Sequence, residues 1–249
     1  MNLNIAWLYP KQMSTYGDRG NIITLVKRCR WRNIDVNIDE IDLGDKIDSK
    51  KYDLYFFGGG QDRSQIKVSE DLQKIKRGDL VRAADEGAVF LSICGGYQLL
   101  GHYYQPSEGN KLEGVGILDV ITKASGTRMI GNLVIKANKD FIRNKFNPLT
   151  LVGFENHSGK TYLGKKASPL GLVEKGFGNN GEDKTEGAVQ RNVFGCYLHG
   201  PLLPKNPHFA DLLIKTALSK RFGDVELKNL KDSEELLAHD AAIQRSRSV

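Results

Sequence analysis

The stretch of residues 88–98, AVFLSICGGYQ, decides the fold of this 249-residue chain. Its first six residues form an apolar run broken only by Ser92, which predicts a strand buried on both faces, as in a parallel sheet. The run ends at Cys94, two glycines follow, and Tyr97 begins a short apolar helix. A strand, a tight turn with small neighbours and a helix are the parts of a nucleophile elbow. We therefore predict that Cys94 is a nucleophile, rather than a core cysteine that happens to precede a glycine turn.

The Cys94 thiol needs a base, because a free thiol is only a few per cent ionised at neutral pH. The elbow places the thiol at the carboxyl end of the sheet and at a helix N-terminus, whose dipole favours the thiolate. His199 is the strongest candidate for the base, because it ends the apolar run VFGCYL and precedes Gly200. Taken alone, His199 would be a surface histidine at the end of a strand. The other histidines fit less well, since His102 lies too far along the elbow helix and His239 lies in a polar tail.

A second glycine cluster predicts an oxyanion hole. Gly58-Gly59-Gly60 follows the apolar run of residues 52–57, and Gly95 follows the nucleophile. Backbone N–H groups at such turns can stabilise the negative charge that develops on a carbonyl under attack. A plain strand-to-helix turn is the alternative for a glycine triplet by itself.

Outward from the elbow, the first half of the chain alternates apolar runs with helical spacing, which favours an open α/β sheet flanked by helices. We expect strands at 3–8, 35–41, 52–57, 88–93 and 192–198, and helices at 21–32, 69–86 (with Ser69 as the N-cap) and 206–222. Short strand-like runs at 114–122, 132–137 and 150–155 predict antiparallel additions to a mostly parallel sheet. We expect one domain over 1–222 and a polar C-terminal extension over 223–249, frayed at its end.

Composition excludes several classes of protein. Hydrophobic residues make up 40% and charged residues 27%, as in an ordinary globular protein, and no apolar run is long enough to span a membrane. The N-terminus lacks the basic region of a secretory signal, so we expect a cytoplasmic chain. The three cysteines are widely spaced and form no C-x-x-C pair, which argues against disulfides and a cysteine zinc site. The net charge of +6 comes from interspersed charges, without the basic stripe and interleaved aromatics of a nucleic-acid site.

These motifs resemble those of a known family. The elbow SICGGYQ (92–98), the loop GGGQD (58–62) and the distant YLHG (197–200) are similar to class I (triad) glutamine amidotransferases, in the cobyric-acid-synthase-like branch. Within that branch, MSTYGDRGN (13–21), GGGQDRSQ (58–65) and HGP (199–201) resemble the GatD glutaminase subunits of lipid II isoglutaminyl synthase.

The resemblance implies a class I amidotransferase fold and a glutaminase. Cys94 would attack the side-chain amide of L-glutamine and form a glutamyl thioester. His199 would take the thiol proton and pass it to the departing ammonia. Gly59, Gly60 and Gly95 would bind the oxyanion.

The resemblance also implies residues that bind the substrate. Gln98 and the turn Asn156-His157-Ser158 would help to seat glutamine. Arg128 matches a family position linked to binding, and a guanidinium can clamp the α-carboxylate of glutamine with two hydrogen bonds. A surface arginine on a hairpin is the alternative.

A partner follows from the same resemblance. Ammonia would pass to a Mur-ligase-like subunit, MurT, which would amidate the D-glutamate of the lipid II stem peptide. ATP and metal would belong to that partner, since this chain has no phosphate loop of the G-x-x-x-x-G-K-[ST] form; we expect no cofactor and no metal here. We expect no nucleic-acid partner and no stable membrane insertion.

The sequence departs from the family pattern at two places. Ser92 stands where a glycine is usual, and no carboxylate follows His199 closely. The second departure leads to the hypothesis that the partner chain supplies the third catalytic group. Two alternatives remain open: a glutaminase that serves another acceptor, as in cobyric acid synthases, and a noncatalytic binding subunit of the same fold.

Overall fold

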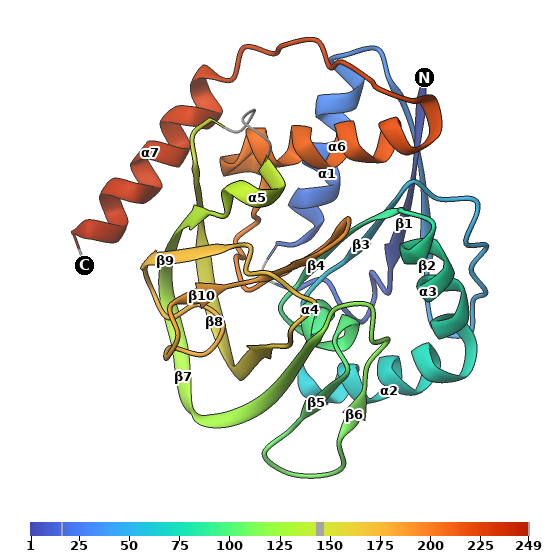
Figure 1. Ribbon diagram of the computed structural model, residues 1–249, viewed down its shortest axis with the longest axis vertical. Coiled ribbons are helices and arrows are strands. Elements are labelled where there is room, and N and C mark those ends of the chain that lie inside the picture. Colours follow the sequence, from blue (N-terminus) through green and yellow to red (C-terminus); the bar gives the residue numbers. More distant parts are fainter. Residues whose placement is uncertain (16, 143–146, 249) are drawn as a thin grey trace.

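The computed structural model describes residues 1–15, 17–142 and 147–248. Its central layer is a six-stranded sheet, sheet A, with the strand order β11-β12-β4-β3-β1-β2 (Figure 1). Neighbouring strands are parallel except at the β11–β12 edge. Its strands are β1 (Asn2–Leu8), β2 (Asp35–Ile41), β3 (Leu54–Phe57), β4 (Val89–Ile93), β11 (Ala188–Gln190) and β12 (Val193–Cys196). The expected open, mostly parallel α/β sheet is confirmed.

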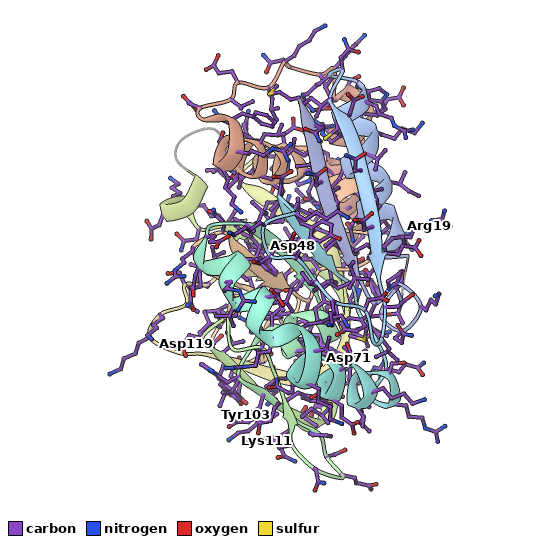
Figure 2. The ribbon with its side chains drawn as sticks, turned by 90° about the vertical axis from the view of Figure 1, so that its right-hand side faces the viewer. Arg19, Asp48, Asp71, Tyr103, Lys111 and Asp119 are labelled. Atoms are coloured by element: carbon purple, nitrogen blue, oxygen red, sulfur yellow. The ribbon has the colours of Figure 1, made fainter. Side chains whose placement is uncertain are left out.

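Helices cover both faces of sheet A because its central strands are apolar on both faces. All residues of β3 and β4 are buried. Helices α1 (Arg19–Arg30) and α6 (Pro207–Phe222) contact each other, and α6 also contacts β1 and β4. Figure 2 shows α3 (Arg77–Asp85) on the other side of the sheet from α1. As its spacing predicts, α1 buries Ile22, Leu25 and Cys29.

The middle of the chain forms a sheet of its own, sheet B, rather than further strands of sheet A. Its order is β10-β9-β7-β5-β6, and β8 pairs with β7. The strands are β5 (Tyr103–Gln105), β6 (Leu112–Glu113), β7 (Val120–Ala137), β8 (Thr150–Leu163), β9 (Gly171–Lys175) and β10 (Thr185–Glu186). The predicted runs at 132–137 and 150–155 are parts of the long antiparallel pair β7–β8. A backbone bridge between Phe154 and His199 joins this pair to the end of sheet A.

The helical region after β3 begins earlier than predicted. Helix α2 (Asp62–Asp71) continues through a π-helical turn (Leu72–Lys76) into α3. Ser69 is therefore not an N-cap; it lies inside α2, and its hydroxyl donates to the Glu113 carbonyl at 2.8 Å. The π-helical turn ends at Lys76, a fully buried side chain that forms an ion pair with Asp71.

The polar C-terminal extension contains a helix up to Arg247, so the predicted fraying of its last residues is wrong there. Helix α6 ends at Phe222 as expected, and Gly223 turns the chain with a φ of +82°. Helix α7 (Ser233–Arg247) then packs on β7 and β8. His239 of α7 is fully buried, and its two ring nitrogens lie 2.8 Å from the Thr150 hydroxyl and 2.8 Å from the Lys205 carbonyl.

A buried ionic cluster ties this extension to the rest of the fold. The Arg28 side chain in α1 is 1% exposed and bonds Asp211 of α6 at 2.6 Å and Asp232, just before α7, at 2.8 Å. Arg32 bonds Asp211 at 2.6 Å as well. Burial alone disfavours the charged guanidinium, but the two aspartates outweigh it and raise the pKa of Arg28. Among the described residues, none of the helices could cross a membrane.

Candidate active site

Cys94 lies on a strained turn between β4 and helix α4 (Gly95–Leu100). Its backbone has a φ of +51° and a ψ of −109°, which a side chain other than glycine rarely adopts. The turn is held by the Cys94 N–H, which donates to the Cys196 carbonyl at 2.8 Å. A Cβ atom on Gly96 would stand 2.5 Å from the Phe57 carbonyl, so only glycine fits there. The geometry is that of a nucleophile elbow, in which strain exposes the nucleophile at the sheet edge.

Ser92 has a packing role that explains its departure from the family pattern. It is fully buried in β4, and its hydroxyl donates to the Phe194 carbonyl of β12 at 3.1 Å. The serine thus joins the strand that carries Cys94 to the strand that precedes His199.

The structure brings Cys94 and His199 together beside Gly59. A Cβ atom on Gly59 would stand 3.3 Å from Cys94 Cβ and 3.0 Å from His199 Cε1. The His199 ring is 1% exposed. Burial alone lowers the pKa of His199, but Cys94 and Asp18 outweigh it and raise that pKa to about 10. Cys94 and His199 therefore lie together at the edge of the sheet, as a cysteine nucleophile and its base require.

The carboxylate that the sequence lacks after His199 comes from the first loop of the chain. Asp18 is fully buried, and its Oδ1 lies 3.6 Å from His199 Nδ1. An acid of this chain thus lies beside His199, although none follows it closely in the sequence, and the hypothesis of a third group from a partner stays a prediction. Asp18 lies in the segment MSTYGDRGN, which the sequence analysis singled out for its resemblance alone.

Asp18 also changes the predicted oxyanion hole. Its Oδ2 accepts the Gly59 N–H at 2.6 Å, so this amide is already engaged, contrary to its predicted role. The other two glycines are neighbours, since a Cβ atom on Gly95 would stand 3.0 Å from the Gly60 nitrogen. Gly95 begins α4, so its N–H has no acceptor within the helix. Gly60 and Gly95 therefore form the better pair of donors.

Gln98 is buried and belongs to a chain of side-chain hydrogen bonds. Its side chain is 4% exposed, and its Nε2 donates to the Tyr197 hydroxyl at 3.1 Å. The same hydroxyl lies 2.6 Å from Thr161 Oγ1 on β8. Gln98 thus links the elbow helix to sheet B, and its described contacts are with the protein core.

The predicted turn Asn156-His157-Ser158 is wrong, because these residues lie inside strand β8. Successive side chains of a strand point to opposite faces of the sheet, so His157 faces one side and its two neighbours face the other. His157 points into the core, where its ring stacks on Tyr197 at a centroid distance of 3.5 Å and its Nδ1 lies 2.8 Å from the Gly159 carbonyl. Asn156 and Ser158 are half-buried on the opposite face.

Arg128 lies on β7, two residues before Ile130, which pairs with Asn156 of β8. It is exposed, and its Nε donates to Asn156 Oδ1 at 2.7 Å. The structure therefore joins two of the predicted substrate-binding residues, while it places Gln98 and His157 in the core.

Glu186 is a buried acid that the sequence analysis missed. It is fully buried beneath the end of β12, where its Oε1 accepts the Tyr197 N–H at 2.6 Å. Burial is the largest cause that raises its pKa, to about 8. Among the described residues, no group of three or more histidine, cysteine or acidic side chains is arranged to hold a metal.

Comparison with known proteins identifies the family. Residues 4–207 match the CobB/CobQ-like glutamine amidotransferase domain. The chain belongs to this family. It is 41% identical to the GatD subunit of the lipid II isoglutaminyl synthase (glutamine-hydrolysing) of Staphylococcus aureus, over 98% of this chain and 96% of that protein. It is 42% identical to the same subunit from Streptococcus pneumoniae, over 92% and 86% of the two chains.

Two further members of the comparison are more distant. A probable cobyric acid synthase of Methanopyrus kandleri is 32% identical over 67% of this chain, which covers 34% of that protein. The crystal structure of a glutamine amidotransferase from Thermotoga maritima has a TM-score of 0.53 at 15% identity, over 99% of this chain and 92% of that one. The resemblance noted in the sequence is confirmed, and the chain is a glutamine-hydrolysing amidotransferase of the class I fold.

Proposed function

We propose that this chain is the glutaminase subunit of a lipid II isoglutaminyl synthase. The observation that carries the proposal is the match to two GatD subunits at 41% and 42% identity along nearly the whole chain. The convergence of Cys94, His199 and Asp18 beside the glycine loop supports it, because these are the groups that amide hydrolysis through a thioester requires.

The proposed chemistry assigns one task to each group. The Cys94 thiolate attacks the side-chain carbonyl carbon of glutamine, and the oxygen takes the negative charge beside the N–H groups of Gly60 and Gly95. Protonated His199 donates to the nitrogen, the C–N bond breaks, and ammonia leaves. Water then attacks the thioester carbonyl and gives a proton to His199, the C–S bond breaks, glutamate leaves, and the thiolate stands again beside protonated His199. Asp18 holds the His199 ring and favours its protonated form.

We further propose that the ammonia passes to a Mur-ligase-like partner, MurT, in the cytoplasm. The partner would bind ATP and metal and amidate the D-glutamate of the lipid II stem peptide in peptidoglycan synthesis, while this chain works without a cofactor. Arg128 and Asn156 are the proposed contacts for glutamine, since their hydrogen-bonded pair is partly accessible on β7 and β8.

A second acceptor is the competing proposal. The family match and the identity to a cobyric acid synthase favour the same glutaminase chemistry with another substrate. The identity and coverage are higher for the GatD subunits, which favours lipid II.

The deciding experiment measures glutamate release and amidation together. The wild type and Cys94→Ala are assayed with and without the Mur-ligase-like subunit, with lipid II and ATP. We expect glutamate release and lipid II amidation for the wild type with the partner, and neither for Cys94→Ala. Glutamate release without amidation, under conditions where free ammonia supports amidation, would exclude lipid II as the acceptor.

A further inference from the structure

Gln65 occupies an unusual place beside the proposed oxyanion hole. It lies in the first turns of α2, five residues after Gly60, and only 2% of it is exposed. Its Nε2 donates to the Gly60 carbonyl at 3.2 Å. The same nitrogen lies 3.0 Å from the position that a Cβ atom on Gly95 would take. One side-chain amide therefore bonds Gly60 and lies beside Gly95, the two glycines whose N–H groups we assign to the hole.

Each carbonyl of the glycine loop, Gly58-Gly59-Gly60, accepts a hydrogen bond, and Gln65 is the donor to the third. The Gly58 carbonyl accepts the Gly96 N–H at 3.1 Å, and the Gly59 carbonyl accepts the Thr15 N–H at 3.2 Å. The Gly59 N–H is held by Asp18. The Gly60 carbonyl is held by Gln65. Glycines have the widest backbone freedom of all residues, so a loop of three needs such bonds to keep one conformation.

Packing alone does not explain a glutamine at this position. Its Oε1 is buried and has no hydrogen-bond partner within the described part of the chain. A buried acceptor without a donor lowers the stability of the folded state. Methionine has a similar length and shape and would fill the same space without that cost. The retained amide therefore points to a task other than stability.

We propose that Gln65 is a positioning residue for the oxyanion hole. By holding the Gly60 carbonyl against α2, it fixes the Gly60 backbone so that the Gly60 and Gly95 N–H groups stand side by side before substrate arrives. Gln65 acts through Gly60 and does not contact the reacting atoms. This inference rests on the proposed hydrolysis of glutamine at Cys94 and adds the residue that prepares the hole for it.

The test substitutes Gln65→Met in the full chain with its partner, and Gln73→Met is the matched control. Gln73 is in the following π-helical turn, and its Nε2 donates to the Gly114 carbonyl at 2.7 Å, in a bond that does not involve the glycine loop. The two variants thus lose the same kind of side-chain-to-carbonyl bond. We expect Gln65→Met to lower kcat for glutamate release about 10- to 100-fold, which is less than the roughly 10²- to 10³-fold cost of removing one oxyanion donor, because the Gly60 N–H itself remains. We expect the KM for glutamine to change less than about twofold, and Gln73→Met to match the wild type.

A second measurement separates positioning from a general structural role. Glutamate γ-semialdehyde reacts with the thiol to form a C–S bond, and its carbonyl oxygen becomes the hemithioacetal oxygen that the hole binds. We expect its inhibition constant to rise in parallel with the loss of kcat, while that of glutamate is unchanged and the melting temperature is unchanged or higher. Wild-type kcat and wild-type affinity for the aldehyde in Gln65→Met would overturn the inference. So would a lower melting temperature with equal losses for both ligands. A wild-type complex that releases no glutamate would instead overturn the proposed function, and the inference with it.

Discussion

Replacing Asp18 by asparagine tests whether this chain supplies its own third group. The Asp18 Oδ1 and His199 Nδ1 atoms are 3.6 Å apart, and at most 1% of either side chain is exposed. Two unit charges at that distance interact by roughly 4–5 kcal/mol at an effective dielectric constant of about 20, which sets an upper limit near 10³-fold in rate. Asparagine keeps an oxygen for the Gly59 N–H, but it presents no charge to the imidazolium.

We expect Asp18→Asn to lower kcat for glutamate release about 10²- to 10³-fold, with a smaller change in KM, because the charge acts on the ring that transfers the proton. The alkaline limb of the rate profile should also move to lower pH. In the wild type the pKa of His199 is raised to about 10, so the ring keeps its proton over the whole physiological range and loses it only as the pH rises through that value. Without the carboxylate that loss begins earlier.

The assay measures glutamate release by the complex between about pH 6 and 10, for the wild type, Asp18→Asn and Asp119→Asn. Asp119 is the matched control, because its Oδ1 lies 2.8 Å from His102 Nε2 in a second Asp–His pair, on the surface (Figure 2). We expect Asp119→Asn to behave as the wild type. An unchanged kcat and an unchanged alkaline limb in Asp18→Asn would refute the assignment and return the third group to the partner.

Two further predictions concern buried charge. The raised pKa of Glu186, about 8 against 4.5 in the unfolded chain, means that the folded state holds a proton that the unfolded state loses, so stability falls as the pH rises from about 4.5 to 8. Glu186→Gln should therefore raise the free energy of unfolding at pH 8.5 by roughly 2–4 kcal/mol and change it little at pH 4.5. Urea unfolding at the two pH values measures this difference, and equal effects at both would contradict the prediction. Arg28→Ala should leave Asp211 and Asp232 without their shared cation and lower the free energy of unfolding by about 2–4 kcal/mol. It should also make the chain between α6 and α7 sensitive to protease. The control Arg30→Ala, at an exposed position of α1, should have neither effect. Cleavage and unfolding of Arg28→Ala that match the wild type would show that the cluster does not anchor α7.

The sequence predicted those parts of the site that depend on residues adjacent in the chain or on the ends of buried strands. The elbow at Cys94 could be predicted from consecutive residues, because a buried strand, a turn with small flanking residues and a helix follow one another without a gap. His199 could be found because it ends a buried strand, and the ends of parallel strands meet at one edge of a sheet. Fold class followed from the same pattern of runs.

The parts that the sequence did not predict depend on tertiary contacts. Asp18 reaches His199 from the first loop of the chain, and no spacing rule connects the two. The residues 156–158 look like a turn because they are polar, yet their neighbour β7 makes them a strand. Helix α7 looks like a polar tail because the residues that it buries, His239 and Ser246, are polar. The Arg28 cluster holds Asp232, which lies just before the helix.

The neighbouring positions of β4 and β12 set where the thiol and the imidazole stand relative to each other. Ile93 pairs with Cys196 in the parallel register, so the strand that leads to the thiol and the strand that leads to the imidazole leave the sheet side by side. The chain between them contains α4, sheet B and β11, and β11 returns to sheet A beside β12. The distance between the thiol and the imidazole therefore depends on this register and not on the length of the chain that separates them.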